Sequence, residues 1–259
     1  MERRILTATP SRGGSALILA CVVSIAALAW AGLFQMGRRD MADIGMVAMG
    51  MTGASWTGRD ALLAFAMWVV MMAGMMIPSA APVLMLFAAT QNQRGGRAVT
   101  PATAMFGAAY FAVWTGFSAA AALAQWGLHQ AAMLTPAMAA SDPRLAGAIL
   151  ISAGVYQLTP WKGRCLSHCR SPLGFLMSRW REGAAGAFRM GLAHGAYCLG
   201  CCWALMGVLF VVGVMNLAWV AALTAFVLLE KTGPGGMWTA RIAGAALVVS
   251  GAVLALRLY

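Results

Sequence analysis

The fold is decided by residues 61–87, which read ALLAFAMWVVMMAGMMIPSAAPVLMLF. No Asp, Glu, Lys or Arg interrupts this stretch, and about 20 apolar residues are enough for one helix to cross the hydrocarbon core of a bilayer. Because unpaired backbone groups are costly in lipid, a segment of this kind has to be helical. The stretch therefore predicts a transmembrane α-helix.

Further apolar stretches follow the same pattern along the chain. They cover residues 15–36, 101–126, 145–161, 189–212, 216–230 and 239–257. The stretches at 145–161 and 216–230 are short for a complete crossing, so six spans with one re-entrant segment are the alternative to seven. The boundary between the fifth and sixth spans falls at Gly213–Asn216. We therefore expect an all-α, polytopic transmembrane bundle of about seven helices, forming one integral membrane domain over residues 1–259.

Composition and charge agree with membrane insertion. Of the 259 residues, 61% are hydrophobic and 10% are charged, whereas a soluble domain needs a larger polar fraction. The net charge is +11, and the basic residues lie between the apolar stretches. This placement orients a bundle in lipid and does not indicate a nucleic-acid partner. One connection holds Lys162, Arg164, Arg170, Arg179, Arg181 and Arg189. The positive-inside rule then places the N-terminus in the cytoplasm.

The connection after the fourth span contains the densest group of metal-ligand residues. It reads CLSHC and supplies Cys165, His168 and Cys169. Thiolate and imidazole ligands suit zinc, copper(I) or an iron–sulfur centre. We interpret the group as metal ligands; the alternative is a pair of free interfacial thiols beside a solvated histidine.

A second group lies on the fifth span. His194, Cys198, Cys201 and Cys202 are spaced i, i+4, i+7 and i+8, which places them on one face of a helix. The fourth span ends on the side where the fifth begins, so the topology predicts that the two groups converge. The alternative is that these cysteines pack as small hydrophobic residues. An unpaired histidine in lipid is unfavourable, and this favours ligand function.

The second span carries a stripe of thioethers. Its methionines recur at helical spacing and are Met71, Met72, Met75 and Met76. Methionine sulfur is a soft ligand for copper(I) and excludes hard ions, so the stripe is a candidate metal relay. Methionine is also a common gap-filler in apolar packing, and the sequence leaves both interpretations open.

Charged residues at the ends of spans have simpler interpretations. Asp60 opens the second span and is expected to act as a helix N-cap. Glu230 and Lys231 close the sixth span, and we expect a pair that extends to the membrane interface.

Three motifs together resemble those of a known family. They are Met67–Pro78 (MWVVMMAGMMIP), Tyr156–Lys162 (YQLTPWK) leading into CLSHC, and Gly191–Trp203 (GLAHGAYCLGCCW). The combination resembles a bacterial family of predicted metal-binding integral membrane proteins, a domain of unknown function in which some members carry a copper-related label. The resemblance covers about residues 60–232 and implies a membrane metal protein.

The residues and the resemblance lead to one functional hypothesis. We expect a protein of a bacterial inner membrane that binds copper(I) for metal delivery, transfer or homeostasis, with a copper-dependent enzyme or a metallochaperone as partner. No ATP-binding loop is present, which excludes a P-type pump, and no enzymatic reaction is indicated.

Two alternatives stay open. Cys198–Cys201 is a Cys-x-x-Cys element, which would suit a membrane thiol–disulfide oxidoreductase. A structural zinc ion in a non-catalytic subunit is the other alternative, because zinc favours closed sites of four ligands and does not use thioethers.

Overall fold

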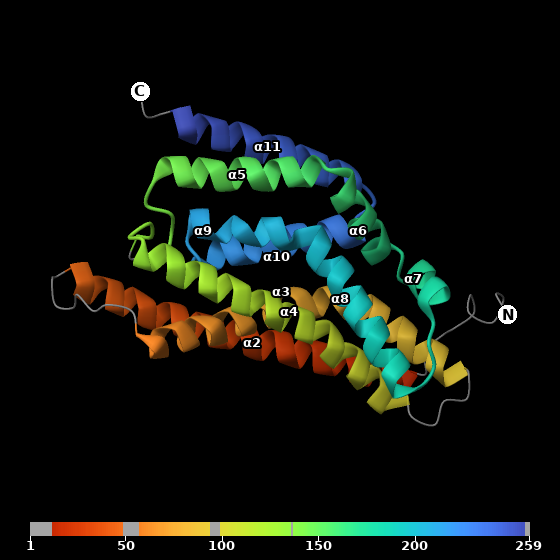
Figure 1. The fold of residues 1–259 in the computed structure, drawn as a ribbon. Coiled ribbons are helices and arrows are strands. Elements are labelled where there is room, and N and C mark those ends of the chain that lie inside the picture. Colours follow the sequence, from red (N-terminus) through yellow and green to blue (C-terminus); the bar gives the residue numbers. More distant parts are fainter. Residues whose placement is uncertain (1–11, 49–56, 94–98, 136, 257–259) are drawn as a thin grey trace.

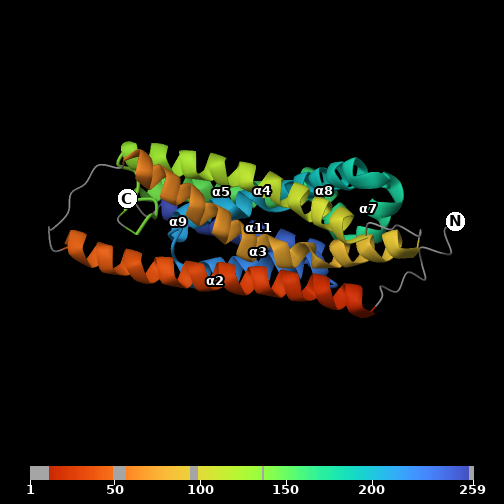
Figure 2. The same cartoon turned by 90° about the horizontal axis from the view of Figure 1, so that it is seen from below.

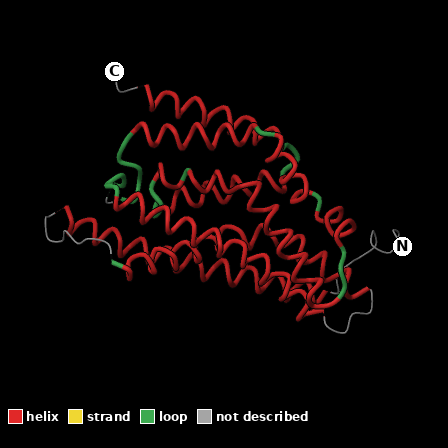
Figure 3. Tube along the Cα trace, viewed as in Figure 1, coloured by secondary structure: helices red, strands yellow, loops and turns green. Residues whose placement is uncertain are grey.

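The computed structural model describes residues 12–48, 57–93, 99–135 and 137–256, and in these ranges the chain is built from helices joined by short connections (Figure 3). The described residues contain no β-strand, only an isolated bridge between Leu134 and Ala140. The prediction of an all-α fold is confirmed.

The helices are named in chain order. They are α2 (Arg12–Ala48), α3 (Gly58–Gln93), α4 (Val99–Gln130), α5 (Pro143–Leu158), α6 (Pro160–Arg170), α7 (Pro172–Arg179), α8 (Gly183–Gly207), α9 (Leu209–Val212), α10 (Leu217–Thr232) and α11 (Gly236–Leu256).

Within the described residues, five segments are long and apolar enough to cross a membrane. They are Gly14–Arg38, Gly58–Gln93, Val99–Gln130, Gly183–Val212 and Gly236–Leu256. The two short spans expected from the sequence appear as α5 and α10, each of 16 residues. At 1.5 Å per residue each is about 24 Å long, less than the ~30 Å of a hydrocarbon core. The structure thus supports membrane association, and the count of seven spans stays a prediction.

The helices form an elongated bundle (Figures 1 and 2). On one side, α2 packs on α3 and α3 on α4; on the other, α5 packs along α11. Helices α8 and α10 lie between these groups, and α8 contacts α4 and α6. The short helices α6 and α7 lie at the end of the bundle where α5 finishes and α8 begins. The CLSHC motif on α6 therefore lies at this end.

Small residues allow the closest helix contacts, as expected in lipid. On α5, a Cβ added at Gly154 would lie 2.6 Å from the Gly244 carbonyl oxygen of α11. On α8, a Cβ at Gly191 would collide with the carbonyl oxygen of Phe106 on α4. Because glycine occupies position 191, α8 can lie directly against α4, and this contact fixes the face of α8 that turns inward.

Two points where one helix ends and the next begins define the surroundings of the cysteines. Thr159 caps α6 and Pro160 begins it, so the connection predicted after the fourth span is itself helical where it carries the CLSHC motif. The chain turns again after α9 at Gly213, whose φ of 93° favours glycine. Asn216 then caps α10, which confirms the boundary expected at 213–216.

The start of α3 differs slightly from the expectation for Asp60. The helix begins at Gly58, and Asp60 accepts hydrogen bonds from the backbone N–H and the hydroxyl of Thr57 at 2.8 and 2.7 Å. Asp60 is therefore the carboxylate of a capping box, three residues after Thr57, and not the N-cap itself.

Candidate functional site

The inward face of α8 carries the second cysteine group. His194, Cys198, Cys201 and Cys202 are all buried on this helix. The periodicity of four residues on one helix face is confirmed. The Cys201 and Cys202 thiols donate hydrogen bonds to the Cys198 carbonyl oxygen at 3.0 and 2.9 Å, which keeps their sulfur atoms next to one another.

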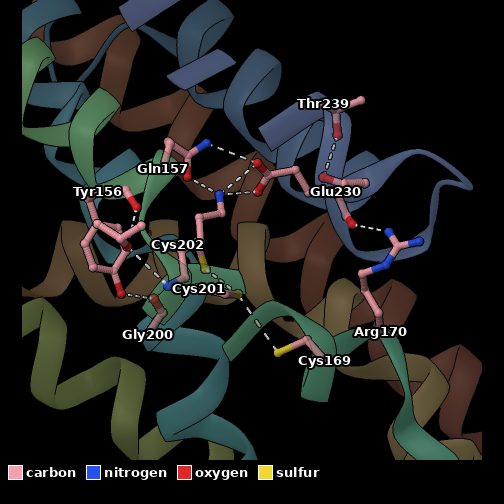
Figure 4. Close-up of polar contacts among 12 residues, drawn as sticks. Tyr156, Gln157, Cys169, Arg170, Gly200, Cys201, Cys202, Glu230 and Thr239 are labelled. Carbon is pink, nitrogen blue, oxygen red and sulfur yellow. Dashed lines mark hydrogen bonds and ion pairs between the residues drawn. The ribbon is translucent and has the colours of Figure 1, made fainter. Parts of the chain in front are cut away.

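Helix α6 brings the first cysteine group to the same place. The Cys201 sulfur lies 4.0 Å from that of Cys169 and 3.7 Å from that of Cys202 (Figure 4). Cys165 approaches one turn earlier, where a Cβ added at Gly200 would stand 2.7 Å from its sulfur. The predicted convergence of the two groups is confirmed for their cysteines. We call Cys169, Cys198, Cys201 and Cys202 the thiol cluster.

The spacing within the thiol cluster is close to that of thiolates sharing one metal ion. With metal–sulfur bonds of about 2.3 Å and tetrahedral angles, two ligand sulfurs stand about 3.8 Å apart. All six cysteines are free thiols. In the described part of the chain, no three or more His, Cys, Asp or Glu side chains are arranged so that they could hold a metal ion. A metal ion would therefore require side chains of the cluster to change position.

The Cys198 sulfur has polar partners that the sequence had not assigned to it. The Lys231 ammonium of α10 lies 3.0 Å from this sulfur and donates to the Ser79 hydroxyl at 2.9 Å. The Tyr110 hydroxyl of α4 lies 3.1 Å from the same sulfur and donates to the Met76 carbonyl oxygen at 3.0 Å. Four helices thus meet at one cysteine.

A second buried polar network lies beside the thiol cluster. The Lys162 ammonium of α6 forms an ion pair with the Glu230 carboxylate of α10 at 2.8 Å, and Gln157 bonds to both (Figure 4). Arg170 donates to the Glu230 carbonyl oxygen. Lys162 and Glu230 are each 1% exposed. The network holds both ends of α6 against α10.

These contacts correct the expectation for Glu230 and Lys231. They do not form a pair that extends to the membrane interface, because both are buried and each has a different partner. Adjacent residues on a helix point about 100° apart. Glu230 therefore turns toward α6 while Lys231 turns toward α8.

Neither candidate histidine is hydrogen-bonded to a cysteine within the described residues. The ring of His168 stacks on Tyr197 with centroids 4.1 Å apart, and its Nδ1 lies 2.8 Å from the Arg164 carbonyl oxygen. His194 lies among aromatic rings, with the Phe175 centroid at 5.1 Å. Its buried Nδ1 has no hydrogen-bond partner. A buried imidazole nitrogen without a partner is unfavourable and is thus available to a ligand.

The cysteines of α6 are held in their protonated form. Hydrogen bonds with Cys198 and Cys201, together with burial, raise the pKa of Cys169 well above its usual range. Burial also raises the pKa of the Cys165 thiol. A metal ion that binds these sulfurs has to displace their protons, which is the usual linkage between thiol ligands and pH.

The methionine stripe of α3 forms part of the apolar core. Met71, Met72, Met75 and Met76 are fully buried, and α3 continues through Pro78. The stripe reaches the thiol cluster through Tyr110, which bonds to the Met76 carbonyl oxygen and contacts the Cys198 sulfur. The burial agrees with packing; the relay stays a prediction.

Residues 65–254 match the model of the PpoB2 family, described as copper chaperone. The chain belongs to this copper chaperone family. The matched segment includes α6, α8 and α10, and therefore the whole thiol cluster with its polar partners. No curated protein and no solved structure matches the chain.

For this member of the copper chaperone family, sequence reasoning missed the roles of Tyr110, Lys162 and Lys231. One signal was present for the lysines. Ionisable residues inside apolar spans are rare and face the bundle interior, so Glu230 and Lys231 could have been assigned inward. Their partners depend on how α10 lies against α6 and α8, which a single sequence does not give.

Proposed function

We propose that the protein is a multi-pass membrane copper chaperone that binds copper(I) at the thiol cluster and passes it to a partner. One observation carries the proposal: the Cys201 sulfur of α8 lies 4.0 Å from that of Cys169 on α6 and 3.7 Å from that of Cys202. Thiolates are soft ligands that favour copper(I). Membership of a copper chaperone family supports the same metal.

The cysteines form a graded path into the protein. Cys165 and Cys169 are half-buried on α6, whereas Cys198, Cys201 and Cys202 are fully buried. We assign Cys165 and His168 to the outer part, where copper enters or leaves. The unpartnered Nδ1 of His194 lies on the same face of α8 as the inner thiols and is a further ligand. The stripe from Met71 to Met76 would extend the path into the bilayer.

We place the bundle in a bacterial inner membrane, and we take residues 1–259 as one integral membrane domain. Seven crossings are supported by Figure 1, in which α2, α3, α4, α5, α8, α10 and α11 begin at alternating ends of the bundle. Arg164 and Arg179 lie in the helices at the end where α8 begins. The positive-inside rule makes this end, where α2 also begins, cytoplasmic.

The proposed role is delivery and not catalysis. The chaperone would exchange copper(I) with a metallochaperone or a copper-dependent enzyme, and the lipid bilayer is its permanent surrounding. Ligand exchange between thiolates requires only that an incoming sulfur reach the ion, and the half-buried Cys165 gives such access. No nucleic acid takes part.

Metal content is the direct test. The protein is purified anaerobically in detergent, loaded with copper(I), and its metals are counted per chain. We expect bound copper in the wild type, loss of copper in Cys198→Ser/Cys201→Ser, and wild-type copper in Cys21→Ser, because Cys21 is exposed on α2. Equal copper in all three proteins, or stoichiometric zinc in its place, would contradict the proposal.

Thiol–disulfide exchange is a second candidate because the Cys198 sulfur lies beside an ammonium, and a cationic neighbour favours the reactive thiolate. Alkylation of the thiols before and after reduction separates the two functions. A redox protein would cycle between a Cys198–Cys201 disulfide and free thiols. A copper chaperone would keep free thiols that bound copper protects from alkylation.

A further inference from the structure

The strongest unexplained feature is the ammonium group beside the thiol cluster. Lys231 is 7% exposed, and its acceptors are the Cys198 sulfur at 3.0 Å and the Ser79 hydroxyl at 2.9 Å. The buried carboxylate next to it in the sequence, Glu230, is bonded to Lys162 through both of its oxygens. In the described part of the chain, no ion pair joins Lys231 to a carboxylate.

A buried charge requires compensation, because the low dielectric of the interior makes an uncompensated ion unfavourable. The acceptors around Lys231 are a hydroxyl, which is neutral, and a thiol. The thiol cluster supplies the negative charge that Lys231 can balance once a metal ion has displaced thiol protons. Because the ammonium lies beside the cluster, the total charge of the buried site depends on the charge of the metal ion that the cluster binds.

The charge of a metal–thiolate group depends on the ion. One copper(I) ion held by two thiolates carries one net negative charge after both thiol protons have left to water. The Lys231 ammonium balances that charge and leaves the buried site neutral. A divalent ion on the same two thiolates is already neutral, so the ammonium becomes an uncompensated positive charge.

We propose that Lys231 is the internal counter-ion of the bound metal and that it makes the thiol cluster selective for a singly charged soft ion over a divalent one. The inference rests on the proposed copper function and adds the source of its selectivity. Lys231 acts through charge and is not itself a ligand, because an ammonium has no free lone pair.

The test compares metal affinities of the purified full chain in detergent. Copper(I) affinity is measured by competition with a chromophoric copper(I) chelator, and zinc affinity with a zinc indicator. Lys231→Met removes the charge and keeps the length of the side chain, whereas Lys231→Arg keeps the charge. Lys162→Met/Glu230→Gln is the comparison variant, because it removes a buried lysine at the same end without changing the net charge. Any displacement of α6 that it causes weakens copper(I) and zinc binding alike, whereas loss of the Lys231 charge weakens copper(I) binding alone.

We expect Lys231→Met to lose about a hundred-fold in copper(I) affinity, which corresponds to about 2.8 kcal/mol, and to keep or gain zinc affinity. Lys231→Arg should bind copper(I) more tightly than Lys231→Met, and the comparison variant should stay within about ten-fold of the wild type. Unchanged copper affinity in Lys231→Met would overturn the inference. A parallel loss of copper and zinc, or an arginine variant as weak as the methionine variant, would also overturn it.

The two proposals fail in different ways. A wild type that binds no copper(I) refutes the chaperone function and this inference with it. A wild type that binds copper(I) as tightly as a folded Lys231→Met refutes only the inference. Circular dichroism of every variant, measured before metal addition, verifies that the helices are intact.

Discussion

The chain has two lysines, and both are buried at the same end of the bundle although they serve different purposes. Lys162 lies 2.8 Å from a carboxylate that is itself held by α10, whereas Lys231 lies 3.0 Å from a thiol. Both oxygens of that carboxylate accept hydrogen bonds from Lys162, and Gln157 bonds to one of them, so the first pair is closed. A thiol can lose or regain its proton and can bind a metal, so the second pair is open to a cargo. The chemical nature of the lysine's partner therefore separates an anchor from a binding site.

The largest expected effect comes from breaking the closed pair. In Lys162→Met the Glu230 carboxylate loses its cation inside the bundle, and breaking a buried pair from one side costs about 3–5 kcal/mol. The free energy of unfolding is measured by denaturant titration in mild detergent. The double variant Lys162→Met/Glu230→Gln should recover most of the loss, because no unpaired charge remains.

The outcome of that experiment decides whether the anchor is as assigned. A loss below about 1 kcal/mol in Lys162→Met would place this pair in the range of exposed salt bridges. The role of the network in holding α6, and with it Cys169, would then be wrong.

A smaller effect is expected from removing the open pair. In Lys231→Met the Cys198 thiol stays neutral, and a methionine fills apolar space among α3, α8 and α10. Unlike Lys162→Met, this exchange leaves no unpaired charge behind in the bundle, so we expect the unfolding free energy of the metal-free protein to change by about 1 kcal/mol or less.

The same denaturant titration measures this second case, with Lys162→Met beside it. Equal losses in the two variants would mean that the two lysines do not differ in kind. The contrast between anchor and site would then have to be abandoned, even if copper affinity falls in Lys231→Met.

The two pairs also differ in how far the sequence could predict them. The face of α8 follows from the spacing of His194, Cys198, Cys201 and Cys202, because helical periodicity is a local property. The turn at Gly213 follows from local signals as well. Neither lysine partner could be predicted, since each pair joins residues more than 30 positions apart and depends on helix packing.

The helix α6 was missed for a related reason. Its sequence PWKGRCLSHCR has a polar composition that resembles a connection between spans. The Thr159–Pro160 start is a recognisable N-terminal signal, with a capping residue followed by proline at the first helical position. Its two cysteines are spaced i and i+4, so the helix explains why Cys165 and Cys169 both turn toward α8.

The smallest effect on the unfolding free energy is expected at the methionine stripe, whose side chains are uncharged and need no counter-ion. A thioether is neutral, so a methionine beside copper(I) adds no charge that Lys231 would have to balance. Single exchanges of Met71, Met72, Met75 or Met76 for leucine conserve volume in a fully buried site and should change the unfolding free energy by only about 0.5 kcal/mol. With all four exchanged, the thiol cluster should still bind its copper, because its sulfur ligands lie on α6 and α8. Copper bound beyond the first equivalent should be lost, as measured by metal analysis under excess copper(I). If the fourfold variant keeps the full copper content of the wild type, the stripe is packing alone and the path ends at the thiol cluster.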